Sequence, residues 1–262
     1  MVGELTTRGW VTFPADPAVA RWVEAALPIA MDRIRDPDEQ RQWLQCEGTR
    51  FVGVDSLPND PDGAVAGSGP LDGDAYRAAR GLYGDLPLHR AQVSVIYPGY
   101  PRPRAGEGEG AFRYRLKRDA AHVDGLLAVG DDRRRHLIER HAYILGLPLN
   151  ACGPTASPLV IWEGSHKIMQ QAFAEALAHV PESKWAEVDL TGIYQAARRE
   201  VFETCPRISL PAKPGEAYLV HRHALHGVAP WGANAEAPPE GRIIAYFRPE
   251  LPVGSQDWLH AP

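Results

Sequence analysis

The 262-residue sequence has few cysteines and no long hydrophobic run. Its three cysteines, Cys46, Cys152 and Cys205, are widely spaced and form no Cys-x-x-Cys pair. An odd number of scattered cysteines argues against a disulfide framework or a structural zinc site and fits a reducing compartment. No apolar run approaches the roughly 18 residues that a membrane span requires, and the first residues contain no apolar signal segment. We therefore expect a cytoplasmic protein with no membrane partner.

The sequence also lacks an excess of positive charge. Its formal net charge is −5, and it contains no long basic block. Nucleic-acid binding depends on basic patches that neutralise phosphates, so we expect no nucleic-acid partner. The basic residues concentrate only between positions 102 and 118, where Glu107, Glu109 and Asp119 dilute them. This region could attract an anionic small molecule, but a solvated loop surface is the simpler interpretation.

What the sequence does contain is a series of short strand patterns separated by helical ones. Helix signals include Asp16 as an N-cap followed by Pro17 at the first helical position. The predicted helices are 17–34, 38–45, 74–83, 131–140, 165–180 and 190–205. The predicted strands are 10–13, 91–97, 112–117, 141–150, 158–162, 207–210, 216–223 and 242–250. Apolar and polar residues alternate strictly in 112–117, which predicts that Arg113, Arg115 and Lys117 share one face of a strand.

This order of elements favours a mainly β fold with helical decoration, namely a β-sandwich or jelly roll with N-terminal and inserted helices. Aliphatic and aromatic residues make up 44% of the chain, enough for a sizeable core. We expect one domain over 1–262, in which the largely helical N-terminal segment, residues 1–88, packs on the jelly roll of 89–252. Two domains divided near residue 88 are the alternative, but the helical segment is small for a core of its own.

The segment "AAHVDG" contains a candidate pair of metal ligands. On a strand, His122 and Asp124 would point to the same face, because side chains alternate along a strand. An imidazole and a carboxylate can both bind a metal. An isolated His-x-Asp motif, however, is more often an ion pair on the protein surface. A metal site needs a third ligand. The segment "GEAYLVHRHALHGVAPWG" (215–232) offers His221, His223 and His226, and spacing alone does not choose among them.

Four stretches of the chain, in the same order, resemble the phytanoyl-CoA dioxygenase family of Fe(II)/2-oxoglutarate-dependent oxygenases. They are "RGWVTFPA", "AAHVDG", "ASPLVIWEGSHK" and the C-terminal segment, and together they extend over roughly residues 6 to 250. The C-terminal segment has Gly215-Glu216, the apolar run "AYLV", His221, His226-Gly227, Pro230 and Arg242. The gap before Arg242 is a few residues longer than is typical of the family.

The resemblance implies a double-stranded β-helix of the cupin-like type that carries an iron site. In this interpretation His122, Asp124 and His226 bind Fe(II), and three open positions remain for 2-oxoglutarate and O2. Arg242 would bind the far carboxylate of 2-oxoglutarate. Tyr97 stands where family members often have a lysine that reaches this co-substrate, so it is a second candidate contact.

The implied activity is that of a dioxygenase that hydroxylates, or otherwise oxidises, a small molecule and releases succinate and CO2. Iron halogenases of this fold have Ala or Gly at the position of Asp124, so a carboxylate there favours hydroxylation. No catalytic residue beyond the metal centre is predicted. Gln92 and Trp231 are candidates for contact with the substrate, although core or edge positions would explain them equally well.

Two alternatives remain open. A cupin-like metal- or ligand-binding protein without 2-oxoglutarate turnover would keep the three ligands but would not need Arg242. A metal-dependent hydrolase or isomerase could use the same ligands with Zn²⁺ or Mn²⁺. For His221 and His223 we predict a structural role on a half-buried strand, and for Ser165 the N-cap of a helix.

Overall fold

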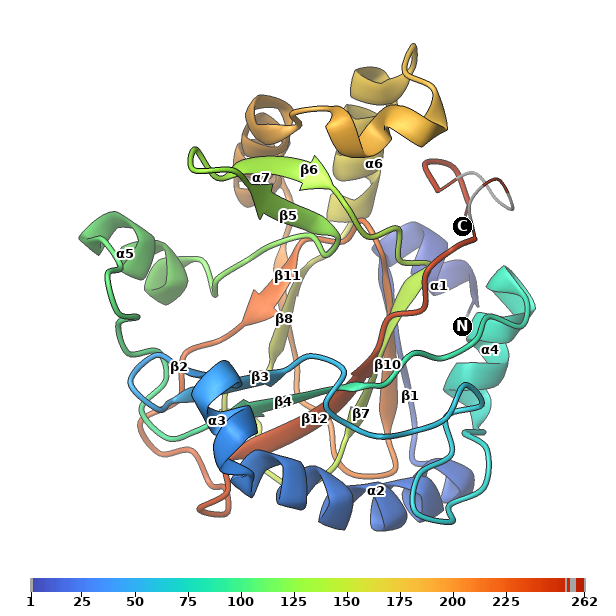
Figure 1. Ribbon diagram of the computed structural model, residues 1–262, viewed down its shortest axis with the longest axis vertical. Helices are drawn as coiled ribbons and strands as arrows, with labels where there is room; N and C mark the ends of the chain where they lie inside the picture. The colour runs from blue at the N-terminus through green and yellow to red at the C-terminus, as the bar shows by residue number, and fades with distance from the viewer. Residues whose placement is uncertain (1, 253, 255–257, 262) are drawn as a thin grey trace.

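The computed structural model describes residues 2–252, 254 and 258–261 (Figure 1). The helices are α1 (Val2–Arg8), α2 (Pro17–Arg35), α3 (Pro37–Trp43), α4 (Asp74–Tyr83), α5 (Glu109–Lys117), α6 (Ser165–Leu177), the 3-10 helix η1 (Glu182–Glu187) and α7 (Thr191–Thr204). The strands are β1 (Trp10–Phe13), β2 (Leu44–Gln45), β3 (Arg50–Gly53), β4 (Gln92–Ile96), β5 (Leu126–Val129), β6 (Arg134–Leu137), β7 (Tyr143–Pro148), β8 (Leu159–Trp162), β9 (Arg207–Leu210), β10 (Ala217–His221), β11 (His226–Val228) and β12 (Arg242–Phe247).

Most of these strands form one large antiparallel sheet. Its seven strands lie in the order β1-β10-β7-β12-β4-β3-β2. A three-stranded sheet, β11-β8-β9, and the two-stranded β5-β6 hairpin complete the antiparallel structure. The prediction of a mainly β fold with N-terminal and inserted helices is therefore confirmed. The first 88 residues contain the three predicted helices, which correspond to α2, α3 and α4, and also α1, which was not predicted. Strands β1, β2 and β3 also belong to this segment, and of these only β1 was predicted.

The two faces of the large sheet have different roles, because alternate residues of each strand point to opposite sides. On β12, Ile243 and Phe247 belong to the larger core, which includes α2 and α4. Trp22 of α2 packs edge-on against Phe247, with ring centroids 5.7 Å apart. Ile244 and Tyr246 face the opposite way and join the inner core. Helices thus cover one face of the sheet, and the other face points toward the small sheet.

The inner face of the large sheet packs on the small sheet. Tyr218 of β10 and Ile244 of β12 lie in the same cluster as Leu159 and Ile161 of β8. The ring of Tyr218 lies over Gly146 of β7, where an added Cβ would approach it to 2.0 Å. Only glycine fits there. Together the two sheets enclose the interior in which the candidate site lies (Figure 1).

The helix signal at Asp16 is confirmed, but two of the predicted elements are wrong. The Asp16 carboxylate accepts a hydrogen bond from the Ala18 N–H at 2.7 Å and caps α2. The predicted strand 112–117 lies in helix α5, where Arg115 is buried and forms an ion pair with Glu107. Residues 131–140, predicted as a helix, form a turn and strand β6, which pairs with β5. In both segments the structure depends on contacts with residues outside the segment, and the local pattern of apolar and polar residues does not indicate these contacts.

The structure also bears on the expectations drawn from composition. Among the described helices, none is long and apolar enough to cross a membrane. The cysteines are all free, and Cys46 is buried.

Candidate metal centre

His122, Asp124 and His226, which we call the metal triad, come together where the small sheet meets the segment before β5. His122 forms an isolated antiparallel bridge with His226, and each N–H donates to the other's carbonyl, at 2.8 and 3.0 Å. The chain of Asp119 approaches so closely that a Cβ at Gly227 would lie 2.2 Å from its carbonyl oxygen. Glycine after His226 is therefore required by backbone packing.

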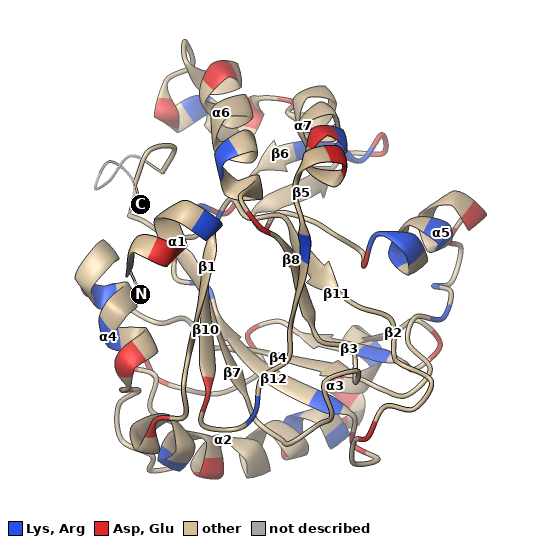
Figure 2. Cartoon of the chain, turned by 180° about the vertical axis from the view of Figure 1, so that it is seen from behind, with Lys and Arg blue, Asp and Glu red and all other residues tan. Residues whose placement is uncertain are grey.

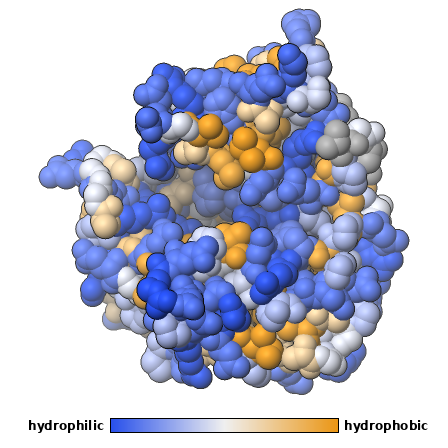
Figure 3. Space-filling model, viewed as in Figure 1, coloured by the Kyte–Doolittle hydropathy of each residue, from blue (hydrophilic) through white to orange (hydrophobic). Residues whose placement is uncertain are grey.

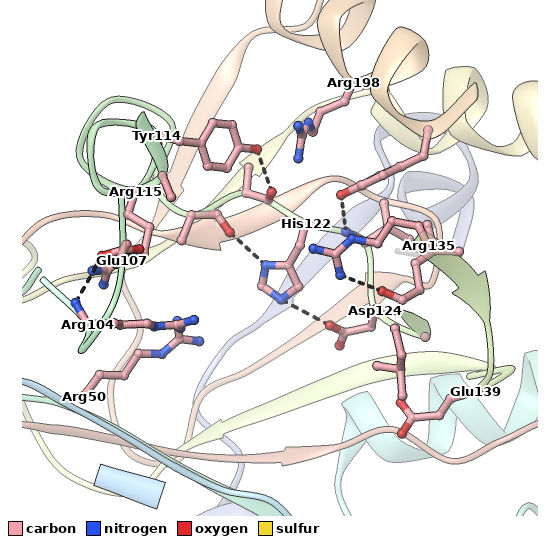
Figure 4. Close-up of a pocket in the computed structure, with 18 of the residues that line it drawn as sticks. Arg50, Arg104, Glu107, Tyr114, Arg115, His122, Asp124, Arg135, Glu139 and Arg198 are labelled. Atoms are coloured by element: carbon pink, nitrogen blue, oxygen red, sulfur yellow. Dashed lines mark hydrogen bonds and ion pairs between the residues drawn. The ribbon is translucent and has the colours of Figure 1, made fainter. Parts of the chain in front are cut away.

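The ligand atoms of the metal triad converge. The Nε2 of His122 lies 3.2 Å from Oδ1 of Asp124, and the Nε2 of His226 lies 3.7 Å from the same oxygen. The two imidazole centroids are 4.6 Å apart. Each Nδ1 donates to a backbone carbonyl two residues earlier, that of Ala120 at 3.0 Å and that of Ala224 at 2.9 Å. Figure 4 shows His122 held between its carbonyl partner and Asp124.

These hydrogen bonds fix which ring nitrogens are free to bind a metal. A carbonyl only accepts, so each Nδ1 carries a proton, and a neutral ring then has a lone pair at Nε2. Burial lowers the pKa of His226 to about 4, although Asp124 opposes this shift, so that ring is neutral at pH 7. Two Nε2 atoms and a carboxylate oxygen thus face one another.

Asp124 is ionised in this setting. Burial alone would raise the pKa of its carboxyl, but Arg248, His226 and His122 together hold the pKa well below its usual value. The Nη1 of Arg248 lies 3.4 Å from Oδ2 of Asp124, so Oδ1 is left to the histidines. All three ligand atoms lie within 4.8 Å of one another. This set, two imidazoles and one carboxylate with converging lone pairs, fits a divalent cation, and non-haem Fe(II) favours it.

A cavity of about 220 Å³ lies beside the metal triad on the inner face of the large sheet. Its walls include apolar side chains from both sheets, such as Ile144 and Leu159, together with the ring of Tyr246. Gln92 and Ser94 of β4 also line it, so Gln92 does lie at the site. The Oε1 of Gln92 accepts a 2.7 Å hydrogen bond from Nη2 of Arg248, and this bond orients the arginine toward Asp124.

Arg242 lies on the same face of β12 as Tyr246, but it is farther from the metal triad. It lines a separate small cavity with Tyr218 and Ile244. The Tyr218 hydroxyl, which donates to that of Tyr246 at 2.8 Å, lies next to its guanidinium. Within the described residues, Nε and Nη2 of Arg242 are buried and have no hydrogen-bond partner. Buried donors normally have partners, so these two atoms mark a place for an acceptor that does not belong to the chain.

Two other candidates point elsewhere. Tyr97 directly follows β4 and packs against the larger core, as Val95 does, and not into the cavity that Gln92 and Ser94 line. Trp231 packs against a separate group of residues that includes Tyr100, and its backbone N–H donates to the Tyr100 carbonyl. Among the residues that the structure describes, neither lines the cavity at the metal triad. Their predicted roles in ligand binding stay predictions.

The other two histidines of the segment 215–232, His221 and His223, form a second group with His166 of α6, which we call the buried histidine cluster. His221 lies 4.8 Å from His166 and 5.2 Å from His223, measured between ring centroids. All three are buried, and His221 and His223 lie deeper than the predicted half-buried strand would place them. Ser165 is not the N-cap of α6, because Gly164 occupies that position; its Oγ instead accepts a hydrogen bond from the Leu225 N–H at 2.9 Å.

Two arginines that line the site, Arg248 and Arg50, were not among the residues predicted from the sequence. Arg248 could have been found, because it lies six residues after Arg242 and so on the same face if the strand pattern continues. Arg50 lies on the short strand β3 and reaches the site only because β3 pairs with β4, opposite Ile96. No local signal in the sequence indicates that pairing.

The fold is similar to those of several solved structures. AviO1 from Streptomyces viridochromogenes Tue57 matches with a TM-score of 0.51 and 15% identity, over 100% of this chain and 96% of that chain. The non-heme alpha ketoglutarate dependent carbocyclase SnoK from nogalamycin biosynthesis matches with a TM-score of 0.51 and 12% identity, over 97% of this chain and 86% of that chain. No family model and no curated protein matches the chain. At these identities the likeness concerns the fold.

Proposed function

We propose that this protein is an Fe(II)- and 2-oxoglutarate-dependent oxygenase of the phytanoyl-CoA dioxygenase type, with its sheets arranged as a double-stranded β-helix. The observation that carries the proposal is the convergence of both Nε2 atoms and Oδ1 of Asp124 at the wall of a cavity. The similarity in fold to SnoK, described as alpha ketoglutarate dependent, supports it. The chain would work as one domain, because strands from its first 88 residues belong to the large sheet.

His122, Asp124 and His226 would hold the iron. When bound, Fe(II) with 2-oxoglutarate and O2 supplies oxidising power, with release of succinate and CO2. The protein holds the ligands in place: backbone carbonyls fix both imidazole tautomers, and Arg248 keeps Asp124 ionised and oriented. The apolar walls from β7 and β8 limit the access of water to the site.

Arg242 would pair with the far carboxylate of 2-oxoglutarate. Its two unpartnered nitrogens are the donors that a carboxylate requires, and Arg242 shares the face of β12 with Tyr246, which lines the cavity at the metal triad. The Tyr218 and Tyr246 hydroxyls connect Arg242 to the cavity at the metal triad. The substrate would be a small molecule. Hydroxylation is the proposed outcome, because Asp124 occupies the position that a halide would need.

The test is an anaerobic titration of the metal-free protein with Fe(II) and then with 2-oxoglutarate, followed by the visible charge-transfer band of the chelate. We expect the band in the wild type and none in His226→Ala. Arg242→Gln should need about 10- to 100-fold more 2-oxoglutarate, as expected for the loss of a charged hydrogen bond of about 1.5–3 kcal/mol. Fe(II) affinity itself should not change in Arg242→Gln.

Arg113→Gln, which removes the same charge from an exposed position on α5, is the matched control and should behave as the wild type. Iron binding without a band would contradict the oxygenase and favour the binding-protein alternative. Turnover of a substrate without O2 would favour the hydrolase or isomerase. A band with an unchanged 2-oxoglutarate requirement in Arg242→Gln would show that another residue holds the co-substrate.

A further inference from the structure

A second and larger cavity adjoins the metal triad on its solvent side. Its volume is about 450 Å³, and it shares four lining residues with the cavity beside the triad: Arg50, His122, Asp124 and Arg248. The side chain of His122 is 43% exposed, so the triad is accessible from this side. Figure 3 shows the hollow in this face of the molecule, between the β5-β6 hairpin and the region of β3 and α3. A molecule in this outer cavity would lie next to the metal.

Positive charge exceeds negative charge on the walls of the outer cavity. Six arginines line it: Arg50, Arg104, Arg115, Arg135, Arg198 and Arg248. The carboxylates that line it are Glu107, Asp124 and Glu139, and each is already engaged. Glu107 pairs with Arg115, with Nε to Oε1 at 2.9 Å, and Glu139 pairs with His141 at 3.0 Å. Asp124 belongs to the metal triad. Figure 2 shows that several basic residues lie on α5 and beside it.

Two of these arginines are not engaged by the protein. Within the described residues, the guanidinium groups of Arg50 and Arg104 form no hydrogen bond and no ion pair, and Nε of Arg50 is buried. Arg104 lies near Glu107, but that carboxylate is held by Arg115. Figure 4 shows both side chains entering the cavity from one side, toward His122. Two such cations repel each other unless an anion lies between them.

The other basic residues are held in place. Nη1 of Arg135 donates to the Leu126 carbonyl at 3.1 Å. Arg198 stacks over two rings, with its Cζ 4.7 Å from the centroid of Tyr114 and 5.2 Å from that of Tyr194. The hydroxyl of Tyr114 donates to the Ala121 carbonyl at 2.7 Å, which fixes this ring at the wall. These rings form an aromatic surface of the outer cavity, and Arg50 and Arg104 form a charged one.

We propose that the outer cavity binds the substrate, and that the substrate is a small molecule with an apolar or aromatic body and an anionic group. Arg50 and Arg104 bind the anionic group, a carboxylate or a phosphate, by charge-assisted hydrogen bonds. The body lies against Tyr114 and Tyr194, with a C–H bond held toward the metal triad. This inference rests on the proposed oxygenase function for its meaning as a substrate site.

The test uses the full chain loaded anaerobically with Fe(II) and 2-oxoglutarate, and calorimetric titration with three probes. Phenyl phosphate and phenylacetate carry the two candidate anionic groups, and 2-phenylethanol is the neutral comparison. We expect at least one anion to bind at least tenfold more tightly than the alcohol, and the tighter of the two identifies the anionic group. The double variant Arg50→Gln/Arg104→Gln should lose this preference. Arg113→Gln, with its side chain outside the cavity, should keep it.

Three results would overturn the inference. The alcohol could bind as tightly as both anions, or the double variant could keep the preference, as it would if the anion bound directly to iron. The double variant could also weaken the binding of 2-oxoglutarate in the charge-transfer titration and leave the binding of phenyl phosphate unchanged. In that case the two arginines would bind the co-substrate. A wild type that binds iron and forms no band, but binds phenyl phosphate through Arg50 and Arg104, would overturn the oxygenase and leave the anion site standing.

Discussion

The metal triad and the buried histidine cluster contain the same kind of side chain at similar spacing, but they suit different roles. Ring centroids are 4.6 Å apart in the triad and 4.8 and 5.2 Å apart in the cluster. The triad contains a carboxylate and lines a cavity, whereas the cluster consists of imidazoles alone. In the cluster, His223 packs against Trp258 at 4.2 Å and against Phe173, beneath α6. Close imidazoles therefore do not make a metal site by themselves.

The difference lies in how each ring is oriented and what faces its free nitrogen. In the triad, carbonyls hold each Nδ1, and each Nε2 faces a carboxylate that attracts a cation. In the cluster, within the described residues, both nitrogens of His223 and Nδ1 of His166 are buried without a hydrogen-bond partner. The guanidinium of Arg222 adds positive charge there. Burial keeps these rings neutral, and among the described residues their nitrogens do not form a converging ligand group as the metal triad does.

The largest expected effect is on Fe(II) affinity, to which the metal triad should contribute and the buried histidine cluster should not. Asp124→Ala removes the carboxylate and leaves Arg248 facing the two imidazoles, so Fe(II) affinity should fall by at least ~100-fold, since even outer-shell partners of a metal contribute 10- to 100-fold. His223→Leu should leave Fe(II) affinity within a factor of about 2. Anaerobic equilibrium dialysis, with circular dichroism to confirm folding, measures both. Iron retained by Asp124→Ala would remove the distinction on which this comparison depends.

The second prediction concerns acid, to which the buried histidine cluster should respond. Burial lowers the pKa of His166 in the folded state and holds those of His221 and His223 well below their usual value. Below about pH 6.5 the unfolded chain takes up protons that the folded protein does not, so stability falls as the pH falls. Above about pH 6.5 these histidines should not make stability depend on pH. Each contributes up to ~1.4 kcal/mol per pH unit until its folded pKa is reached.

Urea unfolding of the metal-free protein between pH 8 and pH 5 measures this loss of stability. His226, with its pKa of about 4, adds to the same trend in the absence of iron. In His223→Leu the free energy of unfolding should fall less steeply with decreasing pH, because one histidine no longer contributes. This holds whatever the effect of the substitution on stability at pH 8. An unchanged slope in His223→Leu would show that this ring is not kept neutral in the folded state.

The smallest expected effect tests a hydrogen bond between neighbours in sequence of the two groups, Ser165 beside His166 and Leu225 beside His226. The Oγ of Ser165 accepts the N–H of Leu225, the residue before His226, so Ser165→Ala leaves a buried donor unpaired. Stability should fall by about 1–3 kcal/mol, and Fe(II) affinity by a few-fold, because His226 is less firmly held. Thr204→Ala, which removes an exposed hydroxyl from the end of α7, is the control and should change neither. Equal effects in the two variants would assign Ser165 no role in holding His226.

The local sequence allowed much of the sheet to be predicted. Strands β7, β8, β10 and β12 are apolar runs between turn residues, and α2 starts at an acidic cap followed by proline. The residue types for metal binding are also visible in the sequence, as "HVD" and "HRHALHG". Spacing did not identify which histidine completes the set. The structure brings His226 to His122 through two backbone hydrogen bonds across a β-bridge.

The tertiary structure alone decided which side chains surround those ligands. Arg50 reaches the metal triad because β3 pairs with β4, and the buried pair of Arg115 with Glu107 accompanies a helix where alternation predicted a strand. The physical reason is that periodicity records which face of a segment is apolar, whereas strand neighbours and ion pairs depend on residues far apart in the chain. The sequence by itself therefore determined the ligand types and most of the strands, and the fold determined the cavity, its arginines and the separation of two histidine groups.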